Sequence, residues 1–295
     1  MRTIIQVPLA YNLISSVHSW IFPDVQPTPE ITTQDTFARV LLINDRDIPT
    51  KIYQEKAGTN LVVDCIDDIV SKKEIKHKVT HTFSLKLSLD NALETIYHDS
   101  ILKRYSTLLS GIRPYLADTI FEGLLKTIIQ QQISYRAANV ITKRLVMGLS
   151  NKSKNDGFFK FPSANTIVLA GKSVLKSFGL GYKTDFVFDI CRMVENGELE
   201  LENLQGVSYD EATEVLLPIR GIGEWTVQAL SIAALGDFST FPYGDLAIQN
   251  VLGKLYHGGR RVSKSEVISY ASALGEAGPL VLYLLMCADA MGLLP

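Results

Sequence analysis

The sequence contains few cysteines, and those it has are poorly placed for shared chemistry. Three occur in 295 residues, Cys65, Cys191 and Cys287, and they lie far apart. An odd number at this spacing predicts no disulfide framework, and cysteine alone cannot build a zinc or iron–sulfur site here. We therefore expect a reducing, intracellular location, which would be cytoplasm and nucleoid or, in a eukaryote, the nucleus.

Long apolar runs are also lacking. No stretch reaches the ~18–20 consecutive apolar residues of a membrane-spanning helix, so we expect no membrane partner. After Arg2, residues Pro8, Asn12 and His18 interrupt the apolar core that a signal peptide needs. A net charge of −2 argues against a protein that coats nucleic acid by bulk charge. It still allows an enzyme that grips a few phosphates.

The composition that is present indicates a folded protein. Hydrophobic residues make up 46% and charged residues 20%, and the length suffices for two or three domains. Basic side chains gather in two places, where a solvated surface and a DNA-binding patch are equally compatible with the pattern. These are Lys143, Arg144, Lys152, Lys154 and Lys160, and then Lys254, Arg260, Arg261 and Lys264.

Hydrophobic periodicity predicts an α+β protein whose strands come first. Short β-compatible runs occupy 39–43, 61–65 and 84–89, and in the last run leucines alternate with polar residues. Helical spacing begins at 91–110 and then dominates. It predicts a long helix over 121–145 and a polar loop at 152–160. Further helices are predicted at 163–178, 182–196, 208–217, 224–235, 245–256, 263–274 and 278–291.

One segment combines a tight turn with a well-placed acid. Gly221 and Gly223 stand between two apolar helical runs, where they permit a sharp turn or a close backbone approach. Unpaired amides at the start of the second helix suit phosphate. Asp245 follows one helix and one Pro/Gly loop later. Taken singly, each feature is more often a plain helix connection or an N-cap worth about 1 kcal/mol.

Four motifs together resemble the helix-hairpin-helix DNA glycosylase superfamily, and in their order the 3-methyladenine DNA glycosylase II family. They are the hairpin Leu217–Gly223, the loop Phe241–Asp245, the segment Phe121–Ser134 and the turn Gly179–Asp185. The resemblance implies an N-terminal antiparallel β domain followed by two mainly helical subdomains that carry the hairpin. We accordingly divide the chain into 1–110, a β-rich domain, 111–255, a helical core with the hairpin, and 256–295, C-terminal helices that pack back on it.

The resemblance makes Asp245 the catalytic residue. An anion there would stabilise the oxocarbenium-like sugar as an N-glycosidic bond breaks, and it could orient the attacking water. An ordinary aspartate pKa near 3.9 would suffice. Bifunctional relatives carry a Schiff-base lysine where this chain has Trp225, so we expect no strand cleavage. The indole could instead face a cationic base, or simply pack in the core. Tyr243 is a further pocket candidate.

The resemblance also implies how DNA is held. Gln132 would fill the gap left by an everted base, and glutamines at a helix junction could equally just cap and hydrate it. The expected DNA-binding residues are Gln131, Gln132, Ser134, Gly221, Ile222, Gly223 and Thr226. Backbone carbonyls of Leu217, Ile219 and Ile222 would hold a monovalent cation, Na⁺ or K⁺. No other cofactor is expected, and the partner is double-stranded DNA with damaged bases, bound by a monomer.

The last predicted helix departs from the family pattern. No aromatic directly follows Pro279 and Gly278–Tyr283 contains no arginine, whereas the family often carries both after this proline. The substrate range therefore stays open, with hypoxanthine, 1-methyladenine and 3-methylcytosine beside 3-methyladenine and 7-methylguanine. We expect a monofunctional glycosylase that flips and excises alkylated bases in base excision repair. The alternatives are a glycosylase for deaminated or oxidised bases and a non-catalytic DNA-damage-binding protein.

Overall fold

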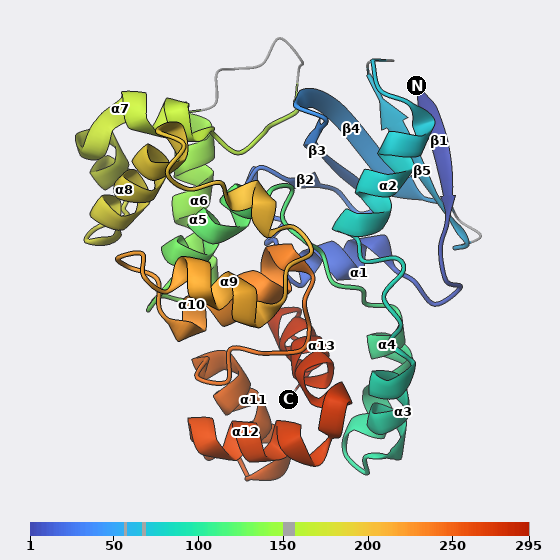
Figure 1. Ribbon diagram of the computed structural model, residues 1–295. Helices are drawn as coiled ribbons and strands as arrows, with labels where there is room; N and C mark the ends of the chain where they lie inside the picture. The colour runs from blue at the N-terminus through green and yellow to red at the C-terminus, as the bar shows by residue number, and fades with distance from the viewer. Residues whose placement is uncertain (56–57, 67–68, 150–156, 295) are drawn as a thin grey trace.

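The N-terminal part of the chain forms an antiparallel sheet (Figure 1). The computed structural model describes residues 1–55, 58–66, 69–149 and 157–294, and within them the strand order is β1-β5-β4-β3-β2. The strands are β1 (Arg2–Gln6), β2 (Ile31–Thr32), β3 (Thr36–Ile43), β4 (Arg46–Gln54) and β5 (Asn60–Cys65). The runs predicted at 39–43 and 61–65 lie in β3 and β5, so both predictions are confirmed, as is the α+β class.

The third predicted strand, over 84–89, is wrong. Ser84 has a left-handed φ of 47°, the N–H of Leu85 donates to Thr80 at 2.9 Å, and that of Leu87 donates to Ser84 at 3.0 Å. The backbone therefore turns after α2 instead of extending. Alternating burial is real at Leu85–Leu89, but it arises because the turn faces the core with every second residue.

Helices make up the rest of the described chain. They are α1 (Leu13–His18), α2 (Lys72–Thr82), α3 (Asp90–His98), α4 (Ser106–Ser110), α5 (Ile120–Gln130), α6 (Tyr135–Leu149), α7 (Ala164–Ser177), α8 (Lys183–Glu195), α9 (Tyr209–Leu216), α10 (Glu224–Leu230), α11 (Leu246–Tyr256), α12 (Lys264–Ala273) and α13 (Gly278–Ala290). Short helical turns lie at Leu102–Tyr105, Leu201–Leu204, Ser231–Leu235 and Gly275–Ala277. The seven helices predicted from residue 163 onward are confirmed to within a residue or two, except that 224–235 divides into α10 and the turn Ser231–Leu235.

The helix predicted over 121–145 is interrupted. The chain leaves helical geometry after Gln130 and starts again at Tyr135, so two helices, α5 and α6, replace one. Gln132 adopts φ +58° at this break, which a continuous helix cannot accommodate. The loop predicted at 152–160 lies largely outside the described residues.

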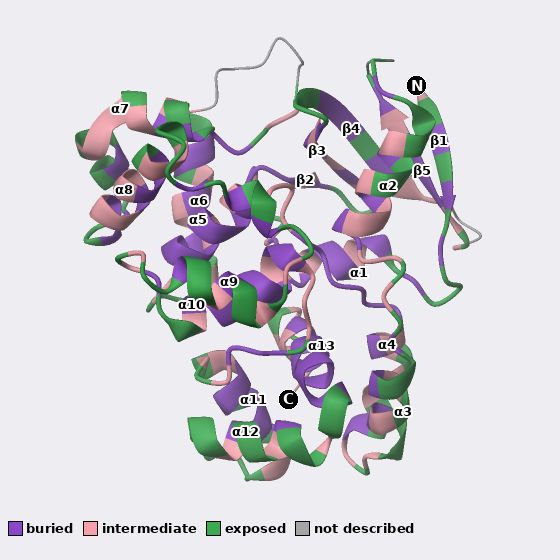
Figure 2. Ribbon diagram, viewed as in Figure 1, coloured by how far each residue is buried: buried purple, intermediate pink, exposed green. Residues whose placement is uncertain are grey.

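Apolar side chains gather in three cores. The first core lies between the sheet and helices α1 and α2. The second is formed by helices α5 through α10, and the third lies between α3 and α4 on one side and α11–α13 on the other. Helices α3 and α4 thus pack with the C-terminal helices α11–α13, although about 130 residues separate the two groups along the chain. The division at 110 and 255 stays a prediction. Figure 2 shows the buried faces of α5, α10 and α13 turned toward the middle of the molecule.

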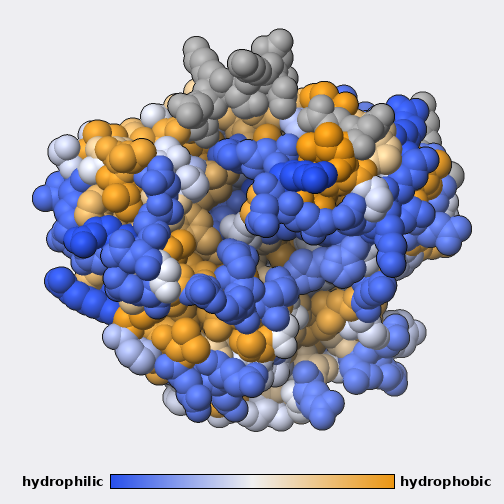
Figure 3. All heavy atoms as spheres, turned by 45° about the horizontal axis from the view of Figure 1, so that its top comes forward, coloured by the Kyte–Doolittle hydropathy of each residue, from blue (hydrophilic) through white to orange (hydrophobic). Residues whose placement is uncertain are grey.

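On the face shown in Figure 3, hydrophilic residues cover much of the area, and apolar residues appear both in the recesses between them and as smaller patches on the surface. No helix in the described part of the chain is long and apolar enough to span a bilayer.

Candidate active site and nucleic-acid interface

The hairpin between α9 and α10 needs glycine at its first glycine position. Gly221 has φ +93°, and a Cβ placed on it would lie 2.4 Å from Cγ of Phe186 on α8. Backbone conformation and packing therefore both exclude a side chain there. Gly223 differs, since its φ is −119° and a Cβ would meet nothing within 4 Å. The hairpin is closed on its inner side and open at the start of α10.

Gln131 fastens the hairpin to the turn between α5 and α6. Its Nε2 donates to the carbonyl of Gly221 at 2.8 Å and to Oγ1 of Thr226 at 2.9 Å. Thr226 itself is buried. Two segments predicted to hold DNA are thus joined directly, and Gln131 and Thr226 supply the joint.

The turn from Gln131 to Ser134 exposes three side chains, those of Gln132, Ile133 and Ser134. Gln132 is exposed, and the hydroxyl of Tyr182 donates to its Oε1 at 3.1 Å. Ser134 caps α6, because its Oγ accepts from the N–H of Ala137 at 3.2 Å.

Lys183 anchors the end of α5, just before this turn, through a hydrogen bond. It is the lysine of the segment 179–185, and its Nζ donates to the carbonyl of Ile129 at 2.6 Å in a buried position. Burial lowers the pKa of this ammonium. A cation at the last carbonyls of α5 also complements the negative end of that helix.

Asp245 begins α11 and is held through both carboxylate oxygens. Oδ1 accepts from the N–H of Ala247 at 2.8 Å, which is an N-cap bond, and Oδ2 accepts from Nε1 of Trp225 at 3.2 Å. Burial raises the pKa of this carboxyl, and these two hydrogen bonds act against the rise. The sequence pattern gives no sign of how far Asp245 is removed from water, so only the folded chain reveals this rise.

Asp245 and Trp225 both line a cavity of about 90 Å³ where the three cores meet. The same two residues line a larger groove of about 1000 Å³ that runs along the turn Gln130–Tyr135 and the start of α11. Trp20, Gln130, Tyr135 and Met286 also belong to both. The cavity thus opens from the groove, and the carboxylate stands where they join.

Sequence reasoning missed the aromatic side of the cavity. The rings of Trp20 and Tyr135 meet edge to face with centroids 5.2 Å apart, and Nε1 of Trp20 donates to the hydroxyl of Tyr283 at 2.5 Å. Trp20 follows the short helix α1 and belongs to no motif, so only the folded chain brings it here. On the side of α13, Met286 lines the cavity.

Tyr243 lies elsewhere. It packs against Phe241 with ring centroids 6.0 Å apart and lines a different hollow, together with Ala271 and Pro279. It does not appear on the wall of the cavity formed by the described residues. Burial raises the pKa of its hydroxyl.

The residues expected to hold a cation surround the hairpin turn. Leu217 is exposed, Ile222 is buried, and the N–H of Ile222 donates to the carbonyl of Ile219 at 3.1 Å. Carbonyl oxygens have the donor chemistry that a monovalent cation requires, and the cation site at this turn stays a prediction.

Four of the seven described members of the basic groups have acidic partners. Lys254 pairs with Asp289 at 3.6 Å, Arg260 with Glu266 at 2.7 Å and Lys264 with Glu224 at 3.0 Å, all well exposed to solvent. Lys160 pairs with Asp47. Lys152 and Lys154 lie outside the described residues. Lys160 and most of the second group therefore belong to a solvated, ion-paired surface, and a DNA-binding role for the others stays a prediction.

Known proteins resemble this chain in sequence and in fold. A family model described as HhH-GPD superfamily base excision DNA repair protein matches residues 125–276. A putative DNA-3-methyladenine glycosylase of Bacillus subtilis is 30% identical over 135 residues, which are 45% of this chain and 46% of that protein. The chain thus spans under half of that relative's length.

Two other similar proteins cover nearly the whole chain. A probable N-glycosylase/DNA lyase of Methanothermobacter thermautotrophicus is 24% identical over 284 residues, 88% of this chain and 89% of that one. The solved structure of a 3-methyladenine DNA glycosylase from Archaeoglobus fulgidus superposes with a TM-score of 0.85 at 25% identity, covering 97% and 98% of the two chains.

Proposed function

Because the chain belongs to the HhH-GPD superfamily of base excision DNA repair proteins, we propose that it is a monofunctional DNA glycosylase for alkylated bases. Its substrate would be duplex DNA from which one damaged base is flipped into the cavity beside Asp245. The observation that carries this proposal is the position of the Asp245 carboxylate, which stands between the groove and the cavity.

The chemistry of Asp245 follows from charge. Breaking an N-glycosidic bond leaves positive charge on the sugar, and a fixed anion stabilises it where it develops. The bonds from Trp225 and Ala247 favour the ionised carboxyl and fix its direction. The same oxygen atoms can accept a proton from the attacking water. The N-cap and the catalytic role are compatible, since capping uses one lone pair of a charged group.

Base release without strand cleavage follows from the amines near the site. Trp225 occupies the position at which bifunctional relatives carry lysine, and an indole forms no Schiff base. Lys126 also lines the cavity, but its Nζ donates to Glu30 and Glu122 at 2.9 and 2.6 Å. An amine held in place by hydrogen bonds to two carboxylates is not free to reach the sugar and attack it. The lyase named among the relatives is therefore the less favoured alternative.

The turn at Gln132 would support the opened duplex. Its left-handed φ of 58° and its exposure push the side chain out of the surface, and Tyr182 braces it. Filling the vacated stack offsets part of the unstacking cost of a few kcal/mol. The open amides beyond Gly223 would take the phosphate, with Na⁺ or K⁺ held between the hairpin carbonyls and the DNA backbone. The protein would act as a monomer.

The test is base release from methylated duplex DNA, with strand breaks scored before and after hot alkali. We expect free methylated base, with breaks only after alkali. Breaks before alkali would favour the lyase alternative. Tight DNA binding with no release from alkylated, deaminated or oxidised duplexes would reject the glycosylase and leave a damage-binding protein.

A further inference from the structure

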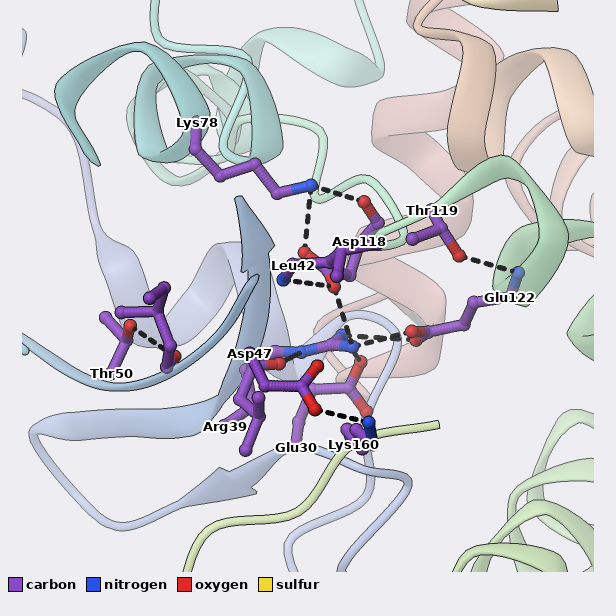
Figure 4. Close-up of polar contacts among 12 residues, drawn as sticks. Glu30, Arg39, Leu42, Asp47, Thr50, Lys78, Asp118, Thr119, Glu122 and Lys160 are labelled. Atoms are coloured by element: carbon purple, nitrogen blue, oxygen red, sulfur yellow. Dashed lines mark hydrogen bonds and ion pairs between the residues drawn. The ribbon is translucent and has the colours of Figure 1, made fainter. Parts of the chain in front are cut away.

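A buried ionic network lies against the cavity. Arg39 is 1% exposed and lies between three acids, with its guanidinium 2.9 Å from Glu30, 2.6 Å from Glu122 and 3.8 Å from Asp118. Figure 4 shows the four side chains converging from the sheet and from the start of α5. Lys78 pairs with Asp118 at 2.9 Å. With Lys126, the network contains three acids and three bases and is neutral as a whole.

Two members of the network reach the cavity wall, Tyr115 and Lys126. The hydroxyl of Tyr115 donates to Glu30 at 2.8 Å and accepts from Arg39 at 3.1 Å, so its proton is committed. Lys126 has three N–H donors and two acceptors, one oxygen each of Glu30 and Glu122. Its side chain is 26% exposed, whereas those of the two acids are 0% and 2% exposed. One N–H is left for the cavity.

An acceptor also lines the cavity. Nδ2 of Asn139 on α6 donates to the carbonyl of Tyr135 at 3.0 Å, so the amide is oriented and its Oδ1 is left to accept. Asn139 also lines the cavity. Helices α5 and α6 therefore present a donor and an acceptor to whatever occupies it.

We infer that Lys126 is a specificity-determining residue that donates to a carbonyl oxygen of the flipped base, so that 6-oxopurines are preferred over 6-aminopurines. In hypoxanthine and 7-methylguanine, a carbonyl at C6 lies beside an N1–H donor, which matches the pair from Lys126 and Asn139. In 3-methyladenine an amino group replaces that carbonyl. The N–H of Lys126 would then face another N–H donor instead of an acceptor. A buried donor without an acceptor costs more than a hydrogen bond gains. This inference rests on the proposed glycosylase activity and selects among its substrates.

The anchoring of Lys126 makes this discrimination effective. A free lysine could swing away from an amino group, but one held by Glu30 and Glu122 cannot do so without breaking a buried pair. Because the network is neutral, the extra positive charge of an N7-methylated base does not meet an uncompensated ammonium. The hydrogen-bonding groups on the edge of the base, and not its charge, therefore decide which base Lys126 favours.

The experiment compares bases within one reaction. Duplex DNA treated with a methylating agent contains both 7-methylguanine and 3-methyladenine, whose release chromatography measures together. A second duplex carries a single deoxyinosine. In Lys126→Met, release of 7-methylguanine and of hypoxanthine should fall roughly tenfold or more relative to 3-methyladenine.

Two further variants separate recognition from stability. Lys78→Met removes a cation from the same network without touching the cavity wall, and it should keep the ratios of the native chain. Lys126→Met/Glu122→Gln restores charge balance and should reproduce the altered ratios of Lys126→Met. Unchanged ratios in Lys126→Met, or equal changes in Lys78→Met, would overturn the inference while leaving the activity intact. Absence of release of any base by the native chain would instead overturn the proposed function, and the inference with it.

Discussion

The indole N–H of Trp225 points at the carboxylate of Asp245, 3.2 Å from Oδ2 and 20 residues away along the chain. The aromatic ring that, by the resemblance, stands where bifunctional relatives carry a Schiff-base lysine is thus bonded to the proposed catalytic acid. This contact couples the charge state of Asp245 to the ring of Trp225, which lines the cavity. It can be probed from either side.

Asp245→Asn should remove base release and spare the fold. Asparagine caps a helix about as well as aspartate, but its single oxygen leaves one of the two N–H donors, from Trp225 or Ala247, without an acceptor, so the protein should stay folded with a loss of about 1–3 kcal/mol in unfolding free energy. Loss of the anion should lower the single-turnover rate by roughly 10²-fold or more, while affinity for abasic duplex survives. A variant that released base at a comparable rate would remove Asp245 from the mechanism.

Trp225→Phe should move the pH dependence of base release. Burial raises the pKa of Asp245, and the bond from Trp225 opposes that rise. Without the bond the pKa rises further. Since the ionised form is active, the rate should then begin to fall at a higher pH as the solution is acidified. The single-turnover rate against pH measures this, and an unmoved acidic limb would contradict it.

Trp225→Ala should change selectivity more than binding. The substitution removes the π face. The preference for cationic over neutral bases should therefore fall by ~0.5–2 kcal/mol, the contribution of a cation–π contact. Release of 7-methylguanine is compared with release of hypoxanthine, beside affinity for undamaged duplex. Trp225→Phe is the control, since it retains a ring. Unchanged selectivity in both variants would return Trp225 to a packing role.

The sequence predicted the parts of the site that lie close together along the chain. The hairpin, Trp225 and Asp245 fall within one continuous segment whose turns and helix starts have local signals. The break at Gln132 was missed because apolar spacing continues across it, although Ser134 is an ordinary N-cap. The pairs Arg39–Glu122 and Trp20–Tyr283 join residues 83 and 263 positions apart. No local pattern encodes such contacts, because tertiary packing alone creates them.

The two hairpin glycines should respond differently to alanine. In Gly221→Ala a residue with φ +93° would gain a Cβ 2.4 Å from Phe186, so we expect a loss of about 1–3 kcal/mol or more in unfolding free energy. Gly223→Ala places its Cβ in open space and should stay folded. It should lower DNA affinity, because the new methyl group stands where phosphate would approach. Urea denaturation and a binding titration measure the two effects. Equal stability of both variants would contradict the packing argument.

Arg39→Met should show that the buried network holds the sheet to the helices. Burial pushes the pKa of Glu122 upward, but the charges of Arg39 and Lys126 outweigh it and bring the pKa to about 2, below the ordinary value of 4.5. A carboxyl with a lowered folded pKa contributes stability that is present above about pH 4.5 and lost as the pH falls toward 2.

Removing Arg39 leaves buried carboxylates short of a partner, so unfolding free energy at neutral pH should drop by about 3–5 kcal/mol. In the native chain the unfolding free energy declines between about pH 4.5 and 2, and in Arg39→Met this decline should flatten. Without the charge of Arg39 to oppose it, burial raises the pKa of Glu122. Arg2→Met is the matched control. That arginine pairs with Asp64 at 2.7 Å on the same sheet but is 64% exposed, and an exposed pair contributes little. If the two variants lost similar small amounts of stability, the network would not be what joins the sheet to α5.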